Sequence, residues 1–357
     1  MMSGENLLLG ITTFTAGTLS LINGILTFVY AKRRKNRVIF LFSTNWFLQA
    51  IFWYLDGTAH LTYTPLIMAI SFIPHTIGVL FLFIYIELIE KENVSTVIVS
   101  FLVIIELLFL SFAFFPGGIE VVPNYGVHII GLCRIFQIVF LIFYVFYYFS
   151  WSYKTWRKSP PELKQNATLL LLGSALFSIV TVLMYVFGTL IKIFNPLGFV
   201  VHGIGAFITV IVIWQDPKLI YVLRFKAYRI IVLETGSGTA LYKYDWAELR
   251  NIDENFFSMM LQAISNVLNE LLHKGEVREV HTDQAILIIQ HNLQYPIASV
   301  VIASKSCKSL RYGLKQFNDQ FVSKFSSDIE QNYHDVSKFD DAIVLVKKVF
   351  DFVPEYK

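Results

Sequence analysis

The stretch VIIELLFL, residues 103–110, places a single carboxylate, Glu106, inside an otherwise continuous apolar run. The run extends from about residue 94 to residue 115, and roughly 20 apolar helical residues are enough to cross the hydrocarbon core of a bilayer. The stretch therefore predicts a membrane-spanning helix. Because an ionised side chain at that depth costs about 2.5–3.5 kcal/mol on insertion scales, we expect Glu106 to face the interior of a helical bundle and to have a partner there.

The chain as a whole is too apolar for an ordinary soluble protein. Of its 357 residues 55% are hydrophobic and 15% are charged, and the mean hydropathy is +0.58. The excess is confined to residues 1–215, which carry 12 Lys and Arg and 8 Asp and Glu, whereas the remainder carries 17 and 18. These densities predict a membrane domain over 1–215 surrounded by lipid, a juxtamembrane linker over 216–227 and a cytoplasmic domain over 228–357.

The membrane domain contains seven stretches of sufficient length and apolarity. They are residues 6–30, 38–56, 65–89, 94–115, 126–150, 167–190 and 197–214. The loops after the first, third and fifth stretches hold ten Lys and Arg, and the other loops hold only Lys192. By the positive-inside rule, this predicts a multi-pass protein of the cell membrane with the N-terminus outside and the C-terminal domain in the cytoplasm. Trp53, Trp151 and Trp214 lie near the ends of stretches and are expected to be interfacial anchors.

A partner for Glu106 can be chosen by its depth in the bilayer. Glu106 lies roughly 18 Å from the inner end of its stretch at 1.5 Å per residue, and Arg134 of the next stretch lies at a similar level. Adjacent antiparallel helices could bring the two together, so we predict an intramembrane ion pair between Glu106 and Arg134. Such a pair could serve a site, or it could only fix the packing of the helices.

Other polar residues are predicted to lie in the outer half of the bundle. Placing the stretches by their ends groups five uncharged polar side chains near this level: Asn45, Gln49, His75, Gln137 and His202. The inner halves are much poorer in such residues, with Glu87 the main exception. The asymmetry predicts a polar pocket open to the outside. The alternative is structural: His75 could satisfy a carbonyl freed by Pro74, and Gly198 and Gly205 beside His202 favour close packing.

The membrane domain resembles the seven-helix sensor region at the N-terminus of some prokaryotic histidine kinases. The resemblance lies in the number of spans, the short loops, the orientation and the C-terminal module that follows the last span. A rhodopsin is excluded because the last stretch, LGFVVHGIGAFITVIVIW, has no lysine for a retinal Schiff base. The Asp-Arg-Tyr and Asn-Pro-x-x-Tyr motifs of G-protein-coupled receptors are absent.

The second domain shows a β-β-α-β-β-β-α-α pattern. YRIIVLE (228–234) and ALYKYDW (240–246) flank TGSG, with Gly236 and Gly238 for a tight hairpin, and an amphipathic helix is predicted over 253–273. VREVHT, AILIIQHN and ASVVIAS predict three further strands, and helices follow at 309–329 and 339–353. This order, with the phrases RIIVLETGSGTALYKYDW, FFSMMLQAISNVLNELL and SLRYGLKQFNDQFVSKF, resembles archaeal longin and roadblock-like domains.

The resemblance implies a fold and a kind of partner. A longin or roadblock-like domain would be an α/β domain with a five-stranded antiparallel sheet, the first helix on one face and the last two on the other. Members of this group typically serve as dimerisation and docking platforms, often for small GTPases or trafficking machinery. The resemblance therefore implies a cytoplasmic protein partner and a homodimer.

Enzymatic, metal-binding and nucleic-acid-binding functions lack support in the sequence. TGSGTALY lacks the lysine and hydroxyl of a phosphate-binding loop, and the histidines of the second domain have no metal-ligand spacing. Cys133 and Cys307 lie in different domains, which gives neither a C-x-x-C site nor a disulfide framework. The second domain carries about one net negative charge, which argues against nucleic acid. We expect no catalytic residue, no metal and no cofactor.

Three functions remain open on the sequence alone. The first is a membrane sensor, in which an extracellular ligand at the outer polar layer changes what the cytoplasmic domain binds. The second is a membrane tether that only presents a longin-like adaptor to small GTPases or trafficking machinery. The third is a transporter or lipid-handling protein with a regulatory tail. The apolar inner halves of the spans argue against this third function.

Overall fold

The computed structural model describes residues 4–34, 37–91, 93–122, 126–188, 190–235, 239–247, 278–283, 285–292, 294–331 and 336–356. The chain divides into two compact units. The first comprises Met1–Ser159 with Leu163–Pro217, and the second comprises Pro160–Glu162 with Lys218–Lys357. The main part of the second unit, Lys218–Lys357, therefore begins within the segment 216–227 that the composition assigns to a linker.

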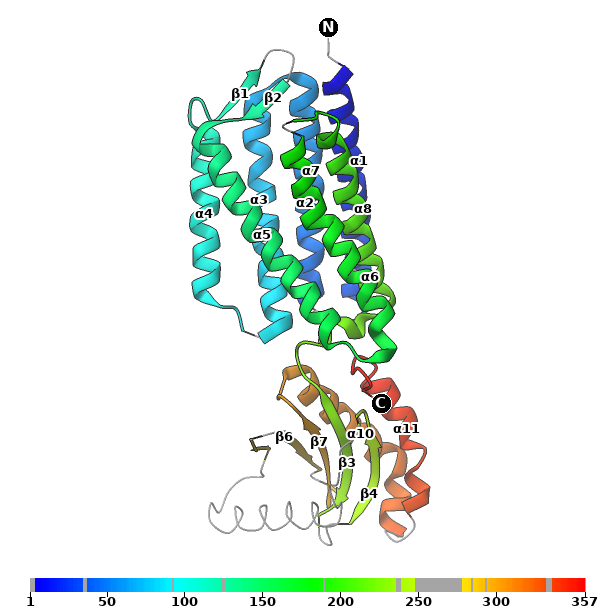
Figure 1. Ribbon diagram of the computed structural model, residues 1–357. Coiled ribbons are helices and arrows are strands. Elements are labelled where there is room, and N and C mark those ends of the chain that lie inside the picture. Colours follow the sequence, from blue (N-terminus) through cyan, green and yellow to red (C-terminus); the bar gives the residue numbers. More distant parts are fainter. Residues whose placement is uncertain are drawn as a thin grey trace. The chain divides into compact units, whose positions relative to one another are not determined.

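The first unit is a bundle of long helices (Figure 1). Its helices are α1 (Gly4–Arg34), α2 (Arg37–Thr62), α3 (Pro65–Lys91), α4 (Thr96–Phe114), α5 (Gly131–Lys158), α6 (Lys164–Ala175), α7 (Thr181–Phe187) and α8 (Phe194–Gln215). A π-helical segment, Leu176–Val180, joins α6 to α7 into one continuous span. In the described ranges, seven such spans are long and apolar enough to cross a membrane, as the sequence predicts for a multi-pass membrane protein.

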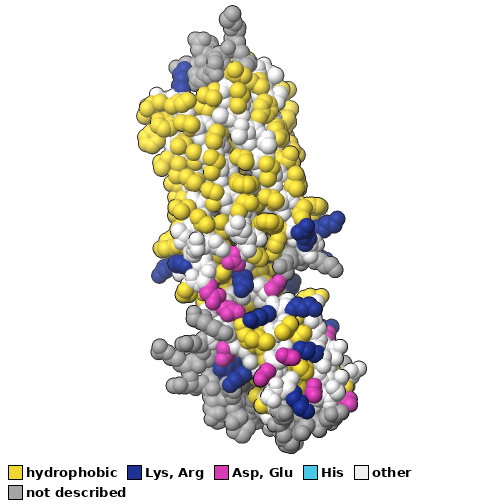
Figure 2. Space-filling view, turned by 90° about the vertical axis from the view of Figure 1, so that its right-hand side faces the viewer, with side chains coloured by type: hydrophobic (Ala, Val, Ile, Leu, Met, Phe, Trp, Pro, Cys, Tyr) yellow, Lys and Arg dark blue, Asp and Glu magenta, His cyan; other side chains and the backbone are white. Residues whose placement is uncertain are grey.

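The surface of the bundle is apolar, as a lipid-facing surface must be. Large side chains such as Val97 and Phe146 are 77% and 72% exposed. Figure 2 shows hydrophobic side chains along the visible face of the bundle, while charged groups gather mainly at one of its ends. We call this end, where α1 and α3 finish and α2 begins, the basic end, because the loops after the first, third and fifth spans hold the ten Lys and Arg.

A β-hairpin lies at the other end of the bundle, which we call the hairpin end (Figure 1). Its strands β1 (Ile119–Val122) and β2 (Gly126–Ile129) pair in antiparallel register, with Ile119 opposite Ile129. Val127 is 1% exposed and packs in a core cluster with Met68 and Phe109. The predicted start of the fifth span at residue 126 is wrong: residues 126–129 are extended because β-branched residues alternate there, and the helix begins at Gly131.

The second unit contains a five-stranded antiparallel sheet. The strands are β3 (Ala227–Glu234), β4 (Ala240–Asp245), β5 (Glu279–His281), β6 (Ile286–His291) and β7 (Ile297–Ala303), in the spatial order β4-β3-β7-β6-β5. A short 3₁₀ helix, Pro217–Tyr221, precedes β3. Every residue of β7 is buried, because this central strand is covered on both faces.

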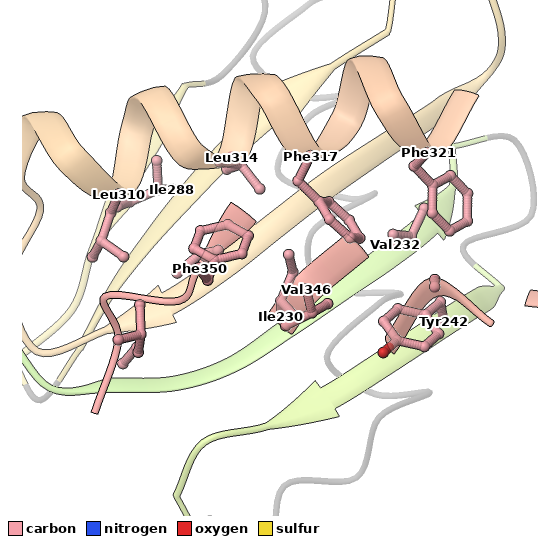
Figure 3. Close-up of a cluster of buried hydrophobic side chains, with 14 of the residues drawn as sticks. Ile230, Val232, Tyr242, Ile288, Leu310, Leu314, Phe317, Phe321, Val346 and Phe350 are labelled. Atoms are coloured by element: carbon pink, nitrogen blue, oxygen red, sulfur yellow. The ribbon is translucent and has the colours of Figure 1, made fainter. Parts of the chain in front are cut away.

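Two helices of the second unit pack on one face of its sheet. Ile230 and Val232 of β3 lie in one core cluster with Leu314 and Phe317 of α10 (Lys308–Gln331). Val346 of α11 (Ala342–Val349) belongs to the same cluster, shown in Figure 3. This placement agrees with the predicted positions of the last two helices.

The opposite face of the sheet is buried as well. Residues that alternate with those of the first face form a second cluster, which includes Ile231, Leu233, Val300 and Ile302. The helix predicted over 253–273, and Gly236 and Gly238 of the predicted hairpin, lie outside the described residues. The sheet itself follows the order and the strand positions that the hydrophobic alternation predicts.

Candidate functional site

A cavity of about 170 Å³ lies inside the first unit toward its hairpin end, and we call it the bundle cavity. Its walls come from α1 to α5, β2, the π-helical segment, α7 and α8. The structure brings four of the five predicted pocket residues together here: Gln49, His75, Gln137 and His202. Asn45, the fifth, is not among the described lining residues.

Gln49 of α2 and His75 of α3 form a reciprocal contact across the cavity wall. The His75 Nδ1–H donates to Gln49 Oε1 at 2.9 Å, and Gln49 Nε2 donates to the His75 backbone carbonyl at 3.3 Å. The imidazole packs against the rings of Phe52 and Phe140 at centroid distances of 4.4 and 5.6 Å. The side chain of His75 therefore pairs with Gln49 rather than with a carbonyl freed by Pro74.

His202 of α8 is held by the π-helical segment. Its Nδ1 lies 3.2 Å from the backbone carbonyl of Phe177, and its ring packs on the Phe177 ring at 4.3 Å. Because a carbonyl can only accept, Nδ1 carries the hydrogen and Nε2 of the neutral ring is an acceptor. A π-bulge inserts one extra residue into a helix and displaces backbone groups from the regular ladder, and such bulges are frequent at functional sites.

Two polar atoms that belong to cavity-lining residues are buried without a hydrogen-bond partner in the described part of the chain. They are Nε1 of Trp53 and Nε2 of His202, whose rings meet edge to face at 5.3 Å. Trp53 is 6% exposed, so the expectation that it anchors the chain at the membrane interface is wrong, and the same holds for Trp151 at 1%. Trp214, at 46% exposed, lies on the surface as expected.

Further polar residues of the cavity lie toward the hairpin end. Asp56 and His60, one helical turn apart on α2, approach to 3.7 Å, and both line the cavity. The Tyr185 hydroxyl of α7 donates to Gln137 of α5 at 3.0 Å. The guanidinium carbon of Arg134 lies 5.9 Å from the centroid of the Tyr185 ring.

The predicted ion pair between Glu106 and Arg134 is not formed. Glu106 of α4 is 6% exposed, and its Oε1 has no hydrogen-bond partner within the described ranges. Arg134 instead lies against Tyr185, on the side of α5 that faces α7. Depth along a helix follows from residue counting, but the direction in which a side chain points around the helix axis does not, and here the two residues point to different neighbours.

The basic half of the bundle is less apolar than the sequence suggests. Asn45 lies eight residues from the start of α2 at Arg37, roughly 12 Å along the axis, and therefore in this half. Its amide atoms, those of Asn23 and the Nε1 of Trp46 are buried without hydrogen-bond partners in the part of the chain that the structure describes. The prediction of an apolar inner half is therefore wrong, and Asn45 does not belong to the outer layer.

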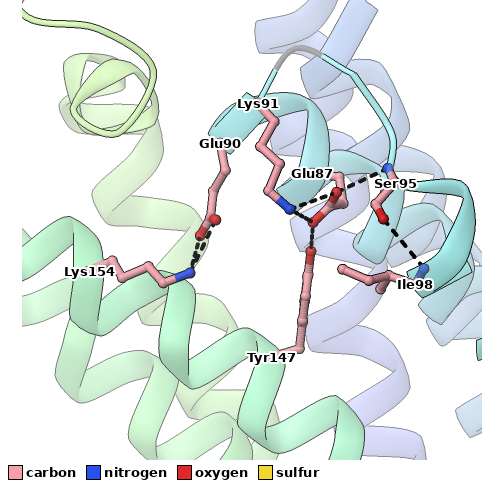
Figure 4. Close-up of polar contacts among 7 residues, drawn as sticks. All are labelled: Glu87, Glu90, Lys91, Ser95, Ile98, Tyr147 and Lys154. Atoms are coloured by element: carbon pink, nitrogen blue, oxygen red, sulfur yellow. Dashed lines mark hydrogen bonds and ion pairs between the residues drawn. The ribbon is translucent and has the colours of Figure 1, made fainter.

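A separate polar cluster surrounds Glu87 near the basic end (Figure 4). The carboxylate of Glu87, whose side chain is 1% exposed, accepts from the Tyr147 hydroxyl of α5, from Lys91 Nζ at 3.1 Å and from the Ser95 backbone N–H at 3.1 Å. Glu90 and Lys154 add a second link between α3 and α5 at 3.2 Å. The cluster ties α3, α5 and the start of α4 together, so we assign it a structural role.

Sequence reasoning missed several residues of the bundle cavity. The i, i+4 spacing of Asp56 and His60 near the end of the second span was a visible signal. Phe177 and Tyr185 gave no sequence signal of a site, because aromatic residues in a span are usually lipid-facing or core residues. Among the described residues, no cluster of His, Cys, Asp and Glu is arranged to hold a metal ion.

Comparisons with protein-family models, with curated proteins and with solved structures gave no match for this chain.

Proposed function

We propose that this protein is a membrane sensor in which a small ligand bound in the bundle cavity changes the behaviour of a cytoplasmic docking domain. The observation that carries the proposal is the cavity itself, which is walled mainly by apolar and aromatic side chains and contains a few convergent polar groups. The polar lining residues include Gln49, His75, Gln137 and His202. The proposal places the ligand among them.

The path from the cavity to the second unit runs through α8. Gly198, Phe199 and His202 of this helix line the cavity. The same helix continues to Gln215, and the 3₁₀ helix Pro217–Tyr221 and the five residues 222–226 then connect it to β3. A shift of α8 on ligand binding would reach the second unit through this short connection. For such a signal, the ligand must bind two conformations with different affinities.

The second unit is proposed to be a longin or roadblock-like docking domain. Its support is the antiparallel sheet with α10 and α11 on one face, together with the sequence resemblance described above. The partner would be a cytoplasmic protein such as a small GTPase, and a homodimer through this domain is part of the proposal. The orientation with the N-terminus outside the cell membrane follows from the distribution of Lys and Arg.

The proposal is tested on the full chain in lipid nanodiscs. Compounds are screened for an increase in the thermal unfolding temperature, and the best is tested on Val182→Phe, which fills the cavity, and on Leu183→Phe. Leu183 is 50% exposed on the same helix and serves as the control. We expect Val182→Phe to weaken binding at least tenfold, which corresponds to about 1.4 kcal/mol, and Leu183→Phe to leave it unchanged.

Hydrogen exchange then distinguishes a sensor from a tether. For a sensor, the bound ligand changes amide exchange in the second unit, beyond Lys218. If the ligand binds but changes exchange only in residues 4–215, the bundle acts as an anchor with a binding site and the sensor proposal fails. If no compound stabilises the protein and Val182→Phe raises the unfolding temperature, the cavity is only a packing defect.

A transporter is the second candidate, and one observation favours it. Phe177 lines the bundle cavity and also touches Trp46, whose indole N–H belongs to the buried polar atoms of the basic half. A movement of this one ring could connect the two polar regions. In that case Asn45→Cys would react with a water-soluble thiol reagent applied to the basic end in the presence of ligand. No reaction with or without ligand would exclude a continuous path.

A further inference from the structure

One side of the bundle cavity is less enclosed than the others. The lining residues that α1, α2 and α4 contribute, among them Trp53 and Phe109, are all buried. The lining residues of α7 are all partly exposed: Thr181, Val182 and Tyr185. None of the residues of α7, all of which the structure describes, is buried. Since both groups line the same cavity, the exposure at α7 indicates that the wall is open there.

The side of α5 that faces α7 is partly exposed as well. Four residues at intervals of three or four lie on one side of this helix: Arg134, Gln137, Leu141 and Val145. All four are partly exposed, and the last three line the cavity. This side points toward α7, because Gln137 accepts from the Tyr185 hydroxyl at 3.0 Å.

We call this part of the wall, with Leu141 of α5 and Val182 of α7, the side opening. Toward the basic end it is bounded by Phe177, whose ring packs on the Tyr148 ring of α5 at 4.9 Å. Figure 1 shows α5 close to α6 near the basic end and apart from α7 toward the hairpin end. Both helices belong to candidate membrane spans, so the side opening faces hydrocarbon rather than water.

Arg134 is a cation beside the side opening. Its guanidinium carbon lies 5.9 Å from the centroid of the Tyr185 ring, and the described part of the chain offers it no ion pair. A charge within a span is costly unless it is paired, so an anion that binds here would be stabilised by Arg134.

The levels of these residues along α5 match those of a lipid. The helix has 28 residues and is roughly 42 Å long, about 12 Å more than the hydrocarbon core of a bilayer. Arg134 lies three residues from its start at Gly131, roughly 4.5 Å, and therefore at the level of the head groups. Leu141 lies ten residues from the start, roughly 15 Å, and therefore at the level of the acyl chains.

An anionic amphiphile satisfies both features. An arginine binds a carboxylate or a phosphate through parallel hydrogen bonds. The apolar side opening and the largely apolar cavity behind it favour a hydrocarbon chain. A water-soluble anion would match only the first feature, and an uncharged hydrocarbon would match only the second.

We propose that the bundle cavity holds a hydrocarbon chain of an anionic membrane lipid, which passes through the side opening while its head group pairs with Arg134. This inference rests on the proposed function, since it names the class of ligand for the same cavity.

A dodecanoic acid that carries a diazirine in its chain tests the proposal on the full chain in nanodiscs of zwitterionic lipid. Labelled peptides are identified by mass spectrometry. We expect saturable labelling of residues that line the cavity, such as Leu141, Phe177 and Val182. Unlabelled dodecanoate should compete about tenfold more strongly than dodecanol, because hydrogen bonds between charged groups are stronger than those to a neutral group. Dodecylamine should compete most weakly, because its charge has the same sign as that of Arg134.

Arg134→Gln tests the head group. In this variant the advantage of dodecanoate over dodecanol should disappear, while dodecanol itself still competes. Lys192→Gln is the control, because it removes an exposed positive charge that does not belong to the described cavity lining, and it should keep the advantage. A variant that merely misfolds would lose both competitors together, so the ratio of the two remains informative.

Leu141→Trp tests the path of the chain. It fills the side opening and should abolish saturable labelling, whereas Ile142→Trp should leave the labelling unchanged, because Ile142 is 59% exposed on the same helix. Val182→Phe closes the same opening from α7, so the test does not depend on a single variant.

The outcomes separate this inference from the proposed function. Equal competition by dodecanoate, dodecanol and dodecylamine would overturn the anionic head group. Labelling that does not saturate and is confined to exposed residues such as Ile142 would overturn the site, since the probe then contacts the protein only as bulk lipid. In both cases a hit from the compound screen would leave the sensor proposal standing. Saturable labelling of the cavity without a change in hydrogen exchange beyond Lys218 would support this inference and overturn the sensor.

Discussion

Glu106 and Arg134 both lie within candidate membrane spans but do not pair. Because Glu106 Oε1 has no partner within the described residues, burial of this carboxylate lowers the free energy of unfolding rather than raising it. We expect Glu106→Gln to leave the unfolding temperature unchanged or to raise it. Arg134→Met should have an independent effect, with a coupling energy below about 0.5 kcal/mol in a double-mutant cycle measured by thermal unfolding. A coupling of several kcal/mol would show that the pair forms in the membrane.

Gln49 and Asn45 lie on the same helix, one turn apart, and allow a matched comparison. Gln49 makes two hydrogen bonds to His75, whereas the amide of Asn45 makes none in the described ranges. Gln49→Leu should therefore destabilise the protein by about 1–3 kcal/mol, because it leaves His75 unsatisfied. Asn45→Leu should be neutral or stabilising. If Asn45→Leu is the more harmful of the two, ordered water must satisfy Asn45, and the basic half of the bundle is hydrated.

The depth of the cavity residues could be predicted from the sequence, but their grouping only in part. Counting from span ends placed Gln49, His75, Gln137 and His202 at compatible levels, and all four line one cavity. Asn45 was assigned the wrong half because α2 extends to Thr62, six residues beyond the expected end of the span at residue 56. The residues Ala59 and His60 of that extension are buried within the protein, so hydropathy alone could not locate the end of the helix.

At the scale of elements, the close approach of α6 and α8 positions His202 against the π-helical segment. A Cβ added at Gly205 would lie 2.4 Å from the Phe177 backbone nitrogen and 2.7 Å from the Gly173 carbonyl oxygen. Gly205→Ala should therefore destabilise the bundle by about 1–3 kcal/mol and weaken any ligand contact with His202. Gly198→Ala is the control on the same helix, since its nearest neighbour would be Met184 Cβ at 3.3 Å. Equal unfolding temperatures for the two variants would contradict this packing.

In the second unit, Glu279 links the edge strand β5 to α10. Burial alone would raise the pKa of this carboxyl, but hydrogen bonds from Ser306 at 2.7 Å and from Arg311 at 3.0 Å outweigh burial and hold the pKa below its usual value of 4.5. A lowered pKa means that the contribution to stability is complete above the pKa of the unfolded chain and is lost as the pH falls through that of the folded protein.

Glu279→Gln should therefore lower the unfolding temperature at pH 7, and its difference from the wild type should shrink as the pH falls below 4.5 and vanish below the lowered pKa of the folded protein. Asp319→Asn on the exposed side of α10 is the control and should show little difference at either pH. A difference for Glu279→Gln that persists unchanged in acid would mean that the side chain acts through packing rather than through its charge.

The regular elements were predictable, and two irregular ones were not. Alternating β-branched residues placed β3, β4 and β7 within about one residue of their observed bounds, and long apolar runs placed the spans within about eight residues. The β1–β2 hairpin was not predicted: β1 lies between the fourth and fifth stretches and β2 lies in the predicted start of the fifth, although Ile119, Val121 and Val127 carry the alternation of a strand. The π-helical segment Leu176–Val180 has no sequence signal, and its residue Phe177 contacts His202 and Trp46, which are distant in the sequence.

For the whole molecule, the division into two units follows from composition, but the function does not. The change in charge density near residue 216 reflects two solvents, lipid for the bundle and water for the second unit. No such bulk property identifies a ligand, because a binding site consists of a few polar atoms whose positions depend on side-chain packing. The proposed function therefore rests on the residues that line the bundle cavity.

The orientation of the whole chain decides which side of the membrane supplies the ligand. An odd number of spans places the N-terminus and the second unit on opposite sides, and ten Lys and Arg against one predict that the second unit is inside. Alkaline phosphatase, which is active only outside, should be active when fused after residue 118, and green fluorescent protein should fluoresce when fused after residue 160 or 356. The reverse result would place the hairpin end in the cytoplasm. The bundle cavity would then sample cytoplasmic molecules, and the second unit could not dock a cytoplasmic partner.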